Sequence, residues 1–138
     1  MDISKRQIAK IQIERAIDCF LEYHDDVSAI TLAGAAEELL GNIVKKNGGL
    51  NALAYVFEVG NIEYSKFQDF RDEANRIRNE LKHARDTADL NEEISVGIDD
   101  CAQILYRALL MYATATGEAS GKMKDCWAFL RRNHDRIF

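Results

Sequence analysis

The 138-residue chain contains no proline, although ordinary usage would place about seven in a chain of this length. Glycine is also scarce, with eight residues, whereas 47% of the residues are hydrophobic. So few turn-forming residues argue against β-sandwiches and barrels and against proline-rich disordered chains. We therefore expect an all-α protein, with a single domain spanning residues 1–138.

An excess of positive charge is missing as well. The chain has 18 Lys and Arg residues against 23 Asp and Glu residues, a formal net charge of −5. This balance excludes a globally basic nucleic-acid binder. Any site for an anion must therefore be local.

Cysteine is rare and unpaired. Cys19, Cys101 and Cys126 are odd in number and far apart, a pattern typical neither of a zinc site nor of a disulfide framework. We expect no metal, no cofactor and a reducing, cytoplasmic location. No membrane association is expected either, because residues 1–10 lack the apolar run of a secretory signal and the apolar stretch 27–44 contains two glutamates.

Apolar residues recur at three- and four-residue spacing along most of the chain, which is typical of amphipathic helices. The pattern predicts a compact up-and-down bundle of about five helices plus a short C-terminal helix that holds Trp127. The expected helices span residues 4–23, 27–46, 50–57 and 63–83, and a long fifth helix runs from a cap at Asn91 through Ile94 to Tyr112.

Glu37 occupies an unusual position on the second predicted helix. At about 100° per residue it shares a strip of small and apolar residues with Ile30, Ala33 and Gly34, where another backbone could approach closely. A carboxylate buried there must be paired or protonated, because an unpaired buried charge is costly. The alternative is that the strip is a helix edge exposed to water.

Positive charge is concentrated in residues 76–85, which hold four Lys or Arg residues and one Glu. On a continuous helix Arg76, Asn79 and His83 share one face, with Arg78 and Lys82 in the adjacent row. This arrangement resembles a phosphate-facing surface. Composition alone favours a simpler interpretation, a solvated last turn in which cations interact well with the helix dipole.

Arg78, Asn79 and His83 resemble the motif of the HEPN superfamily, with four residues between the arginine and the histidine. That motif is an arginine, usually followed by a polar residue, with a histidine a few positions later. The segment 33–40, AGAAEELL, resembles the earlier helix of these domains, which often presents an acidic or polar residue to the motif. HEPN domains are small helical bundles, so the resemblance covers roughly residues 27–113.

The resemblance implies metal-independent RNA cleavage in the cleft of a homodimer, where two copies of the motif meet. It implies that His83 is a general base or acid, that Arg78 binds the phosphate and that Asn79 orients it. Glu37 would hold Arg78 in place.

Three further cations belong to the same segment, and we expect them to contact the RNA backbone: Lys82, Arg85 and Arg76. A role in surface solubility is the alternative for each of them.

The resemblance also implies a role as a toxin or phage-defence effector, with RNA as the substrate and an antitoxin protein as a partner. In the toxin group whose antitoxin is a nucleotidyltransferase, a tyrosine two residues after the histidine is modified. This chain has Arg85 there, so we do not expect that control. Many HEPN-like domains are non-catalytic, which leaves open a helical module that binds a nucleotide, a nucleic acid or a protein partner, and a plain structural domain.

Overall fold

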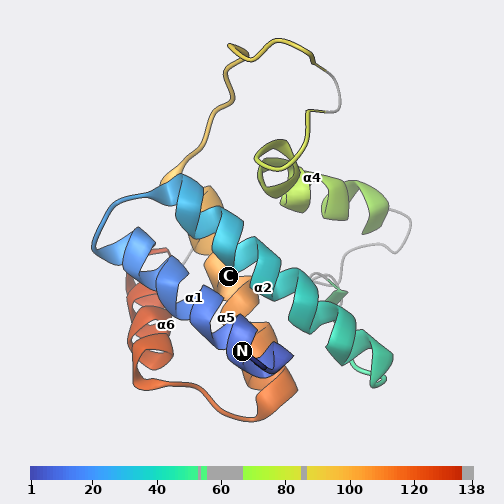
Figure 1. The fold of residues 1–138 in the computed structure, drawn as a ribbon, viewed down its shortest axis with the longest axis vertical. Coiled ribbons are helices and arrows are strands. Elements are labelled where there is room, and N and C mark those ends of the chain that lie inside the picture. The colour runs from blue at the N-terminus through green and yellow to red at the C-terminus, as the bar shows by residue number, and fades with distance from the viewer. Residues whose placement is uncertain (53, 56–66, 85–86, 135–138) are drawn as a thin grey trace.

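The computed structural model describes residues 1–52, 54–55, 67–84 and 87–134, and within these ranges the chain forms helices and no strand (Figure 1). The all-α prediction is confirmed. The helices are α1 (Lys5–Leu21), α2 (Asp26–Lys46), α4 (Phe67–Glu80), α5 (Ile98–Thr116) and α6 (Gly121–Asn133).

Local signals in the sequence set most helix ends. The Ser4 side chain accepts a hydrogen bond from the backbone N–H of Gln7, and Asp25 accepts one from Ser28, so α1 and α2 each begin at a capped residue. Gly48 and Gly117 have φ angles of 85° and 72°, which are left-handed values that glycine adopts without strain. They follow the ends of α2 and α5, as the glycine positions predict.

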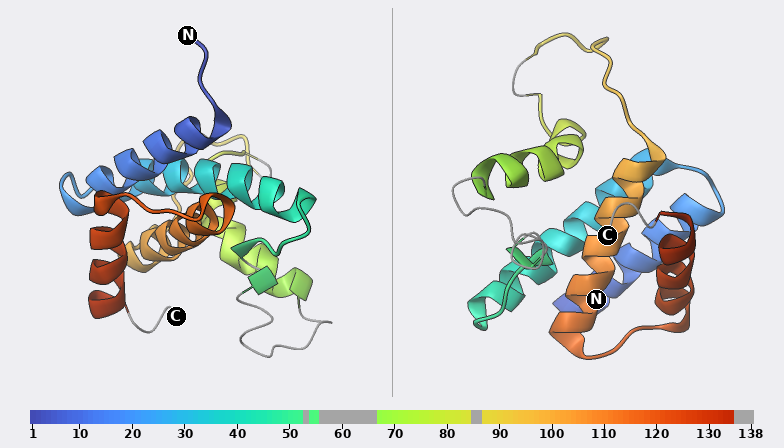
Figure 2. Two further views of the ribbon diagram at one scale, coloured as in Figure 1. Left: turned by 90° about the horizontal axis from the view of Figure 1, so that it is seen from below. Right: turned by 180° about the vertical axis from the view of Figure 1, so that it is seen from behind.

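The hydrophobic core lies between α1, α2, α5 and α6. Its largest fully buried side chains include Ile13 of α1, Ile30 of α2, Leu105 and Tyr112 of α5, and Leu130 of α6. Figures 1 and 2 show α1 and α6 on one side of α2 and α5, while α4 lies on the other side. The helix that carries the basic segment is therefore packed beside the main core.

By length and composition alone, α2 could cross a membrane. The core helix of a soluble protein can meet the same two criteria. In this fold half of that apolar stretch is buried inside the protein, and its buried face includes Glu37. The apolar character of α2 is accounted for by its contacts with α1 and α5.

Two predicted helix boundaries are wrong. The fourth helix ends at Glu80, so His83 lies beyond it, although its backbone N–H still donates to the Asn79 carbonyl at 3.0 Å. The residues from Lys82 to Ala84 are exposed, and without tertiary packing a helix gains little by continuing.

The fifth helix begins at Ile98, and the predicted cap at Asn91 does not form. Ile94 is exposed, so it gives the segment before Ile98 no apolar anchor. Instead the Asp100 carboxylate accepts a hydrogen bond from the Gly97 N–H at 2.9 Å, which fixes the start of the helix.

Part of the third and fourth predicted helices cannot be compared with the structure. Of the short helix predicted over residues 50–57, residues 52, 54 and 55 are helical, and residues 53, 56 and 57 lie outside the described chain. The predicted start of the next helix, at residue 63, also lies outside it.

Replacing Leu105 by alanine tests the position of the core, because this side chain is fully buried. We expect Leu105→Ala to lower the free energy of unfolding by about 2–5 kcal/mol through lost burial and the cavity left behind. The matched control is Leu90→Ala at an exposed leucine, expected to change it by less than about 0.5 kcal/mol. Urea unfolding followed by circular dichroism measures both, and equal effects would contradict the proposed core.

Candidate functional site

Glu37 is buried at the middle of α2, with 5% of its surface exposed. Its neighbours on the strip, including Ile30, Ala33 and Gly34, are buried as well, so the strip is not an exposed helix edge. Of the two alternatives for Glu37, a buried carboxylate and a helix edge exposed to water, the structure shows the buried carboxylate. A carboxylate at this depth needs a partner of opposite charge.

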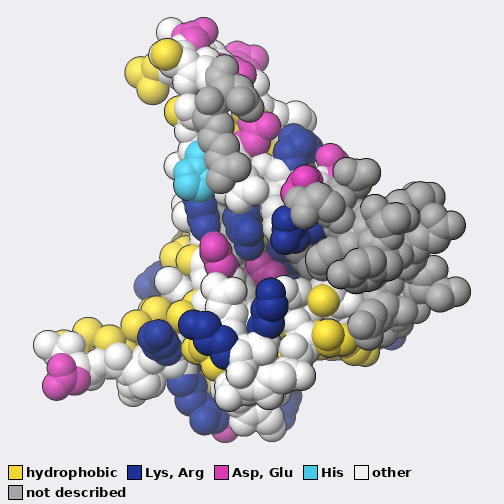
Figure 3. Space-filling view, turned by 90° about the vertical axis from the view of Figure 1, so that its right-hand side faces the viewer, with side chains coloured by type: hydrophobic (Ala, Val, Ile, Leu, Met, Phe, Trp, Pro, Cys, Tyr) yellow, Lys and Arg dark blue, Asp and Glu magenta, His cyan; other side chains and the backbone are white. Residues whose placement is uncertain are grey.

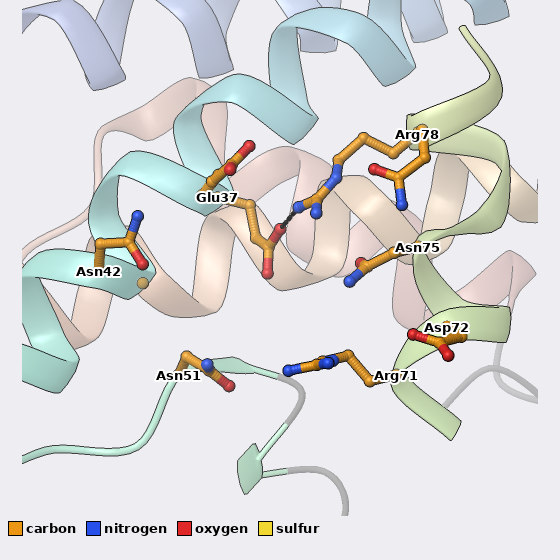
Figure 4. A pocket seen from close by; sticks show the side chains of 10 residues that line it. Glu37, Asn42, Asn51, Arg71, Asp72, Asn75 and Arg78 are labelled. Atoms are coloured by element: carbon orange, nitrogen blue, oxygen red, sulfur yellow. Dashed lines mark hydrogen bonds and ion pairs between the residues drawn. The ribbon is translucent and has the colours of Figure 1, made fainter. Parts of the chain in front are cut away.

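Two arginines supply that partner. One carboxylate oxygen of Glu37, Oε2, accepts a hydrogen bond from Arg78 Nη1 at 2.8 Å and another from Arg107 Nη2 at 3.1 Å. Figure 4 shows the bond from Arg78, which reaches Glu37 from α4. The expected contact between Glu37 and Arg78 is thus present, whereas the catalytic role of the two residues stays a prediction.

Arg107 links three helices from a position on α5 where only 4% of its surface is exposed. Besides Glu37 on α2, it binds two groups on α4: Nη1 donates to the Ala74 carbonyl at 2.9 Å and Nη2 to Asn75 Oδ1 at 2.6 Å. Burial lowers the pKa of the Arg107 guanidinium, and the Glu37 carboxylate opposes this shift. Because the pKa of a free guanidinium is so high, Arg107 remains charged at neutral pH.

The missing side chain of Gly34 makes room for Arg78. A Cβ atom added at Gly34 would lie 2.8 Å from Cδ and 2.9 Å from Cγ of Arg78, closer than non-bonded carbons can pack. The aliphatic part of Arg78 therefore rests on the backbone of α2. Together with the ion pair to Glu37, this contact fixes the direction of the guanidinium.

A polar cavity of about 320 Å³ opens beside this ion pair, between α2, α4 and the segment that follows α2. Figure 4 shows Asn42 and Asn51 on one side of the cavity and Arg71 and Asn75 on the other. Its lining is formed by Glu37, Glu38, Gly41, Asn42, Asn51, Arg71, Asp72, Asn75, Arg78 and Asn79.

The outer edge of the site is formed by residues around the end of α4. Lys82 Nζ donates to Glu38 Oε2 at 3.1 Å, and this hydrogen bond lowers the pKa of the Glu38 carboxyl. His83 is exposed one residue further along. Figure 3 shows this side of the molecule, where Lys and Arg side chains surround acidic ones and a histidine lies at the border.

The structure brings some of the predicted site residues together and separates others. Asn79 lines the cavity with Arg78. Arg76 does not: it pairs with Glu73 at 3.6 Å and lines a different pocket, which faces α5. The helix does not extend to His83 as predicted, and Arg76 and Asn79 line different pockets. Arg85 lies outside the described residues.

Sequence reasoning missed Arg107 as a site residue. The signal was present, since this arginine stands three residues after Ile104 and four before Met111, and both of these side chains are buried. A charged residue in the apolar stripe of a helix indicates a buried partner, as it did for Glu37. The stripe alone does not predict that Arg107 and Glu37 pair with each other.

Metal ligands do not gather in this site. Among the described residues no three His, Cys, Asp or Glu side chains are grouped so that they could hold a metal ion. Cys19, Cys101 and Cys126 are buried free thiols away from the cavity, and burial raises the pKa of all three, that of Cys126 to about 12. They are packed as small apolar side chains.

No protein-family model, no curated protein and no solved structure matches the chain.

The two adjacent glutamates of α2 offer a matched pair of substitutions. Glu37→Gln leaves two buried guanidinium groups without a counter-charge and is expected to lower the free energy of unfolding by about 3–5 kcal/mol. Glu38→Gln breaks only an exposed ion pair, which is worth about 0–1 kcal/mol. Chemical denaturation of both variants at neutral pH checks this, and a Glu37→Gln protein as stable as Glu38→Gln would contradict the buried ion pair.

Two glycines of α2 test the close approach of Arg78. Alanine in a helix is about 1 kcal/mol more favourable than glycine, and at Gly41 the new Cβ meets only Asn51 Cβ at 3.4 Å. We therefore expect Gly41→Ala to gain up to about 1 kcal/mol in stability, again by chemical denaturation. Gly34→Ala must displace Arg78 and is expected to lose about 1–3 kcal/mol. A gain in both variants would place Arg78 away from the α2 backbone.

Proposed function

We propose that the protein is a metal-independent endoribonuclease of the HEPN type that acts as a homodimer. The observation that carries this proposal is the buried ion pair between Glu37 and Arg78, which holds a guanidinium at the wall of a polar cavity. His83 is exposed and acts electrostatically on Glu38, another residue of the cavity lining. The ion pair joins the arginine of the motif to the acidic residue of the earlier helix.

The chemistry of RNA cleavage without a metal gives each group a role. A base removes the proton of a ribose 2′-hydroxyl, the oxygen attacks the adjacent phosphorus, and the bond to the 5′-oxygen breaks as an acid protonates it. The products are a 2′,3′-cyclic phosphate and a 5′-hydroxyl. Histidine suits both proton transfers, because its ordinary pKa lies near neutrality.

Arg78 would stabilise the negative charge that develops on the phosphate oxygens. Nη1 is already bound to Glu37 and Nε is buried, but a guanidinium has five N–H donors, so the remaining N–H groups would bind the phosphate. Fixing the arginine before the substrate binds reduces the entropy lost in the transition state. Asn79, which also lines the cavity, would orient the phosphate.

The proposed homodimer is inferred from the single histidine that the motif contains. One chain supplies one His83, whereas the reaction needs a base and an acid on opposite sides of the phosphate. A second copy of the chain would supply the other imidazole. The exposed position of His83 is compatible with such an arrangement.

A second candidate is a non-catalytic HEPN-like module that binds a nucleotide or nucleic acid. It is favoured by the burial of Arg78, whose side chain is only 11% exposed, and by the position of His83 outside the cavity lining. In that case the same site would hold a phosphate group without cleaving it. A toxin or phage-defence role and an antitoxin partner belong to the first candidate.

Incubation of the purified protein with RNA in EDTA tests the proposal. We expect fragments with cyclic phosphate ends, and a loss of rate of about 100-fold or more in Arg78→Ala and His83→Ala, since each removes a group that acts in the transition state. Circular dichroism establishes that both variants are folded.

The matched controls are Arg131→Ala, an exposed arginine of α6, and His24→Asn, at a left-handed position that asparagine tolerates. Both should cleave at the parent rate. Full activity of Arg78→Ala and His83→Ala would show that the site is elsewhere. A parent protein that binds nucleotides without cleaving RNA would favour the second candidate.

A further inference from the structure

The polar cavity is lined by an unusual number of carboxamide side chains. Asn42 and Asn51 lie on one side, Asn75 on the other and Asn79 near Arg78. Asn51 and Asn75 each use their amide oxygen within the protein, for the N–H of Ala54 and for Arg107 respectively. Among the described residues the side-chain amides of Asn42 and Asn79 have no hydrogen-bond partner.

The charge of the lining does not suit a second phosphate group. Two arginines, Arg71 and Arg78, face three carboxylates, those of Glu37, Glu38 and Asp72, so the lining carries a formal charge of −1. Glu37 is in addition neutralised by Arg107 from behind. Beyond the phosphate placed at Arg78, this lining offers a second phosphate group no excess of positive charge, and it does not repel a neutral group with several donors and acceptors.

A nucleobase has that chemistry. An asparagine amide can donate to a ring nitrogen and accept from an amino group of adenine, and a carboxylate accepts from the amino group of cytosine. Acceptors of both kinds, from Asn42 and Glu38, line the cavity. The cavity volume of about 320 Å³ lies within the range of small-molecule sites. No aromatic side chain is among the described lining residues, so recognition would rest on the base edge rather than on stacking.

We propose that this cavity binds one base of the RNA strand, and that it selects bases with an exocyclic amino group over uracil. The proposal rests on the proposed function, because it places the phosphate of the same nucleotide at Arg78. The cavity extends from Arg78 towards Asn42 and Asn51, so the base would lie near these two asparagines. The site would then give the enzyme a base preference next to the bond that it cleaves.

Titration of the full-length protein with AMP, CMP, GMP and UMP, followed by calorimetry in EDTA, tests this selection. We expect each of the first three nucleotides to bind at least about tenfold more tightly than UMP, the effect of one good base-edge contact. Asn42→Ala should reduce that difference to less than about twofold, because it removes an acceptor without disturbing a hydrogen bond inside the described protein. The matched control, Asn91→Ala at an exposed asparagine outside the cavity, should keep it.

The proposal is overturned if UMP binds as tightly as the other nucleotides, if none of the four binds, or if Asn42→Ala keeps the difference. These outcomes are separate from a failure of the ribonuclease proposal. RNA cleavage in EDTA with no preference among the four bases would overturn the base site alone. Selective binding without any cleavage would overturn the nuclease and leave the base site in place.

Discussion

The buried carboxylate of Glu37 is the interaction on which the arrangement of the site depends. It accepts hydrogen bonds from an arginine of α4 and an arginine of α5, and Arg107 also holds the backbone of α4. A charge at that depth is tolerated only because it is neutralised where it lies. Among the described side chains of α4 Ile77 belongs to the buried core, and Arg78 adds the ion pair to Glu37.

This way of attaching a helix determines what the site can do. Arg78 is held on one side by an ion pair and on the other by the bare backbone at Gly34, so its guanidinium has little freedom. The residues that face solvent, Lys82 and His83, lie beyond the last turn of α4 and are fixed by few contacts. The cation of the site is therefore held in place within the fold, whereas the histidine is open to solvent.

Periodicity predicted the all-α class, the approximate extent of α1 and α2 and the presence of a short C-terminal helix, because these helices bury a regular apolar face. The odd position of Glu37 on its helical wheel, together with the resemblance of the Arg78 motif, predicted the contact between the two residues. The role of Arg107 was not predicted, because its partner is far away in the sequence and no local pattern joins them. The end of α4 and the start of α5 were predicted wrongly for a different reason: Ile94 and His83 continue a helical spacing, but no neighbouring helix in the described chain packs against them.

The position of α4 beside the four-helix core has a consequence for local unfolding. The helices α1, α2, α5 and α6 bury most of the core residues between them and therefore form a cooperative unit. Among the described side chains of α4, Ile77 belongs to that core. Hydrogen exchange in α4 should therefore occur through a partial opening of lower free energy than global unfolding. Such an opening would separate Arg78 from Glu37 while the core stays folded, so the site can be lost without global unfolding.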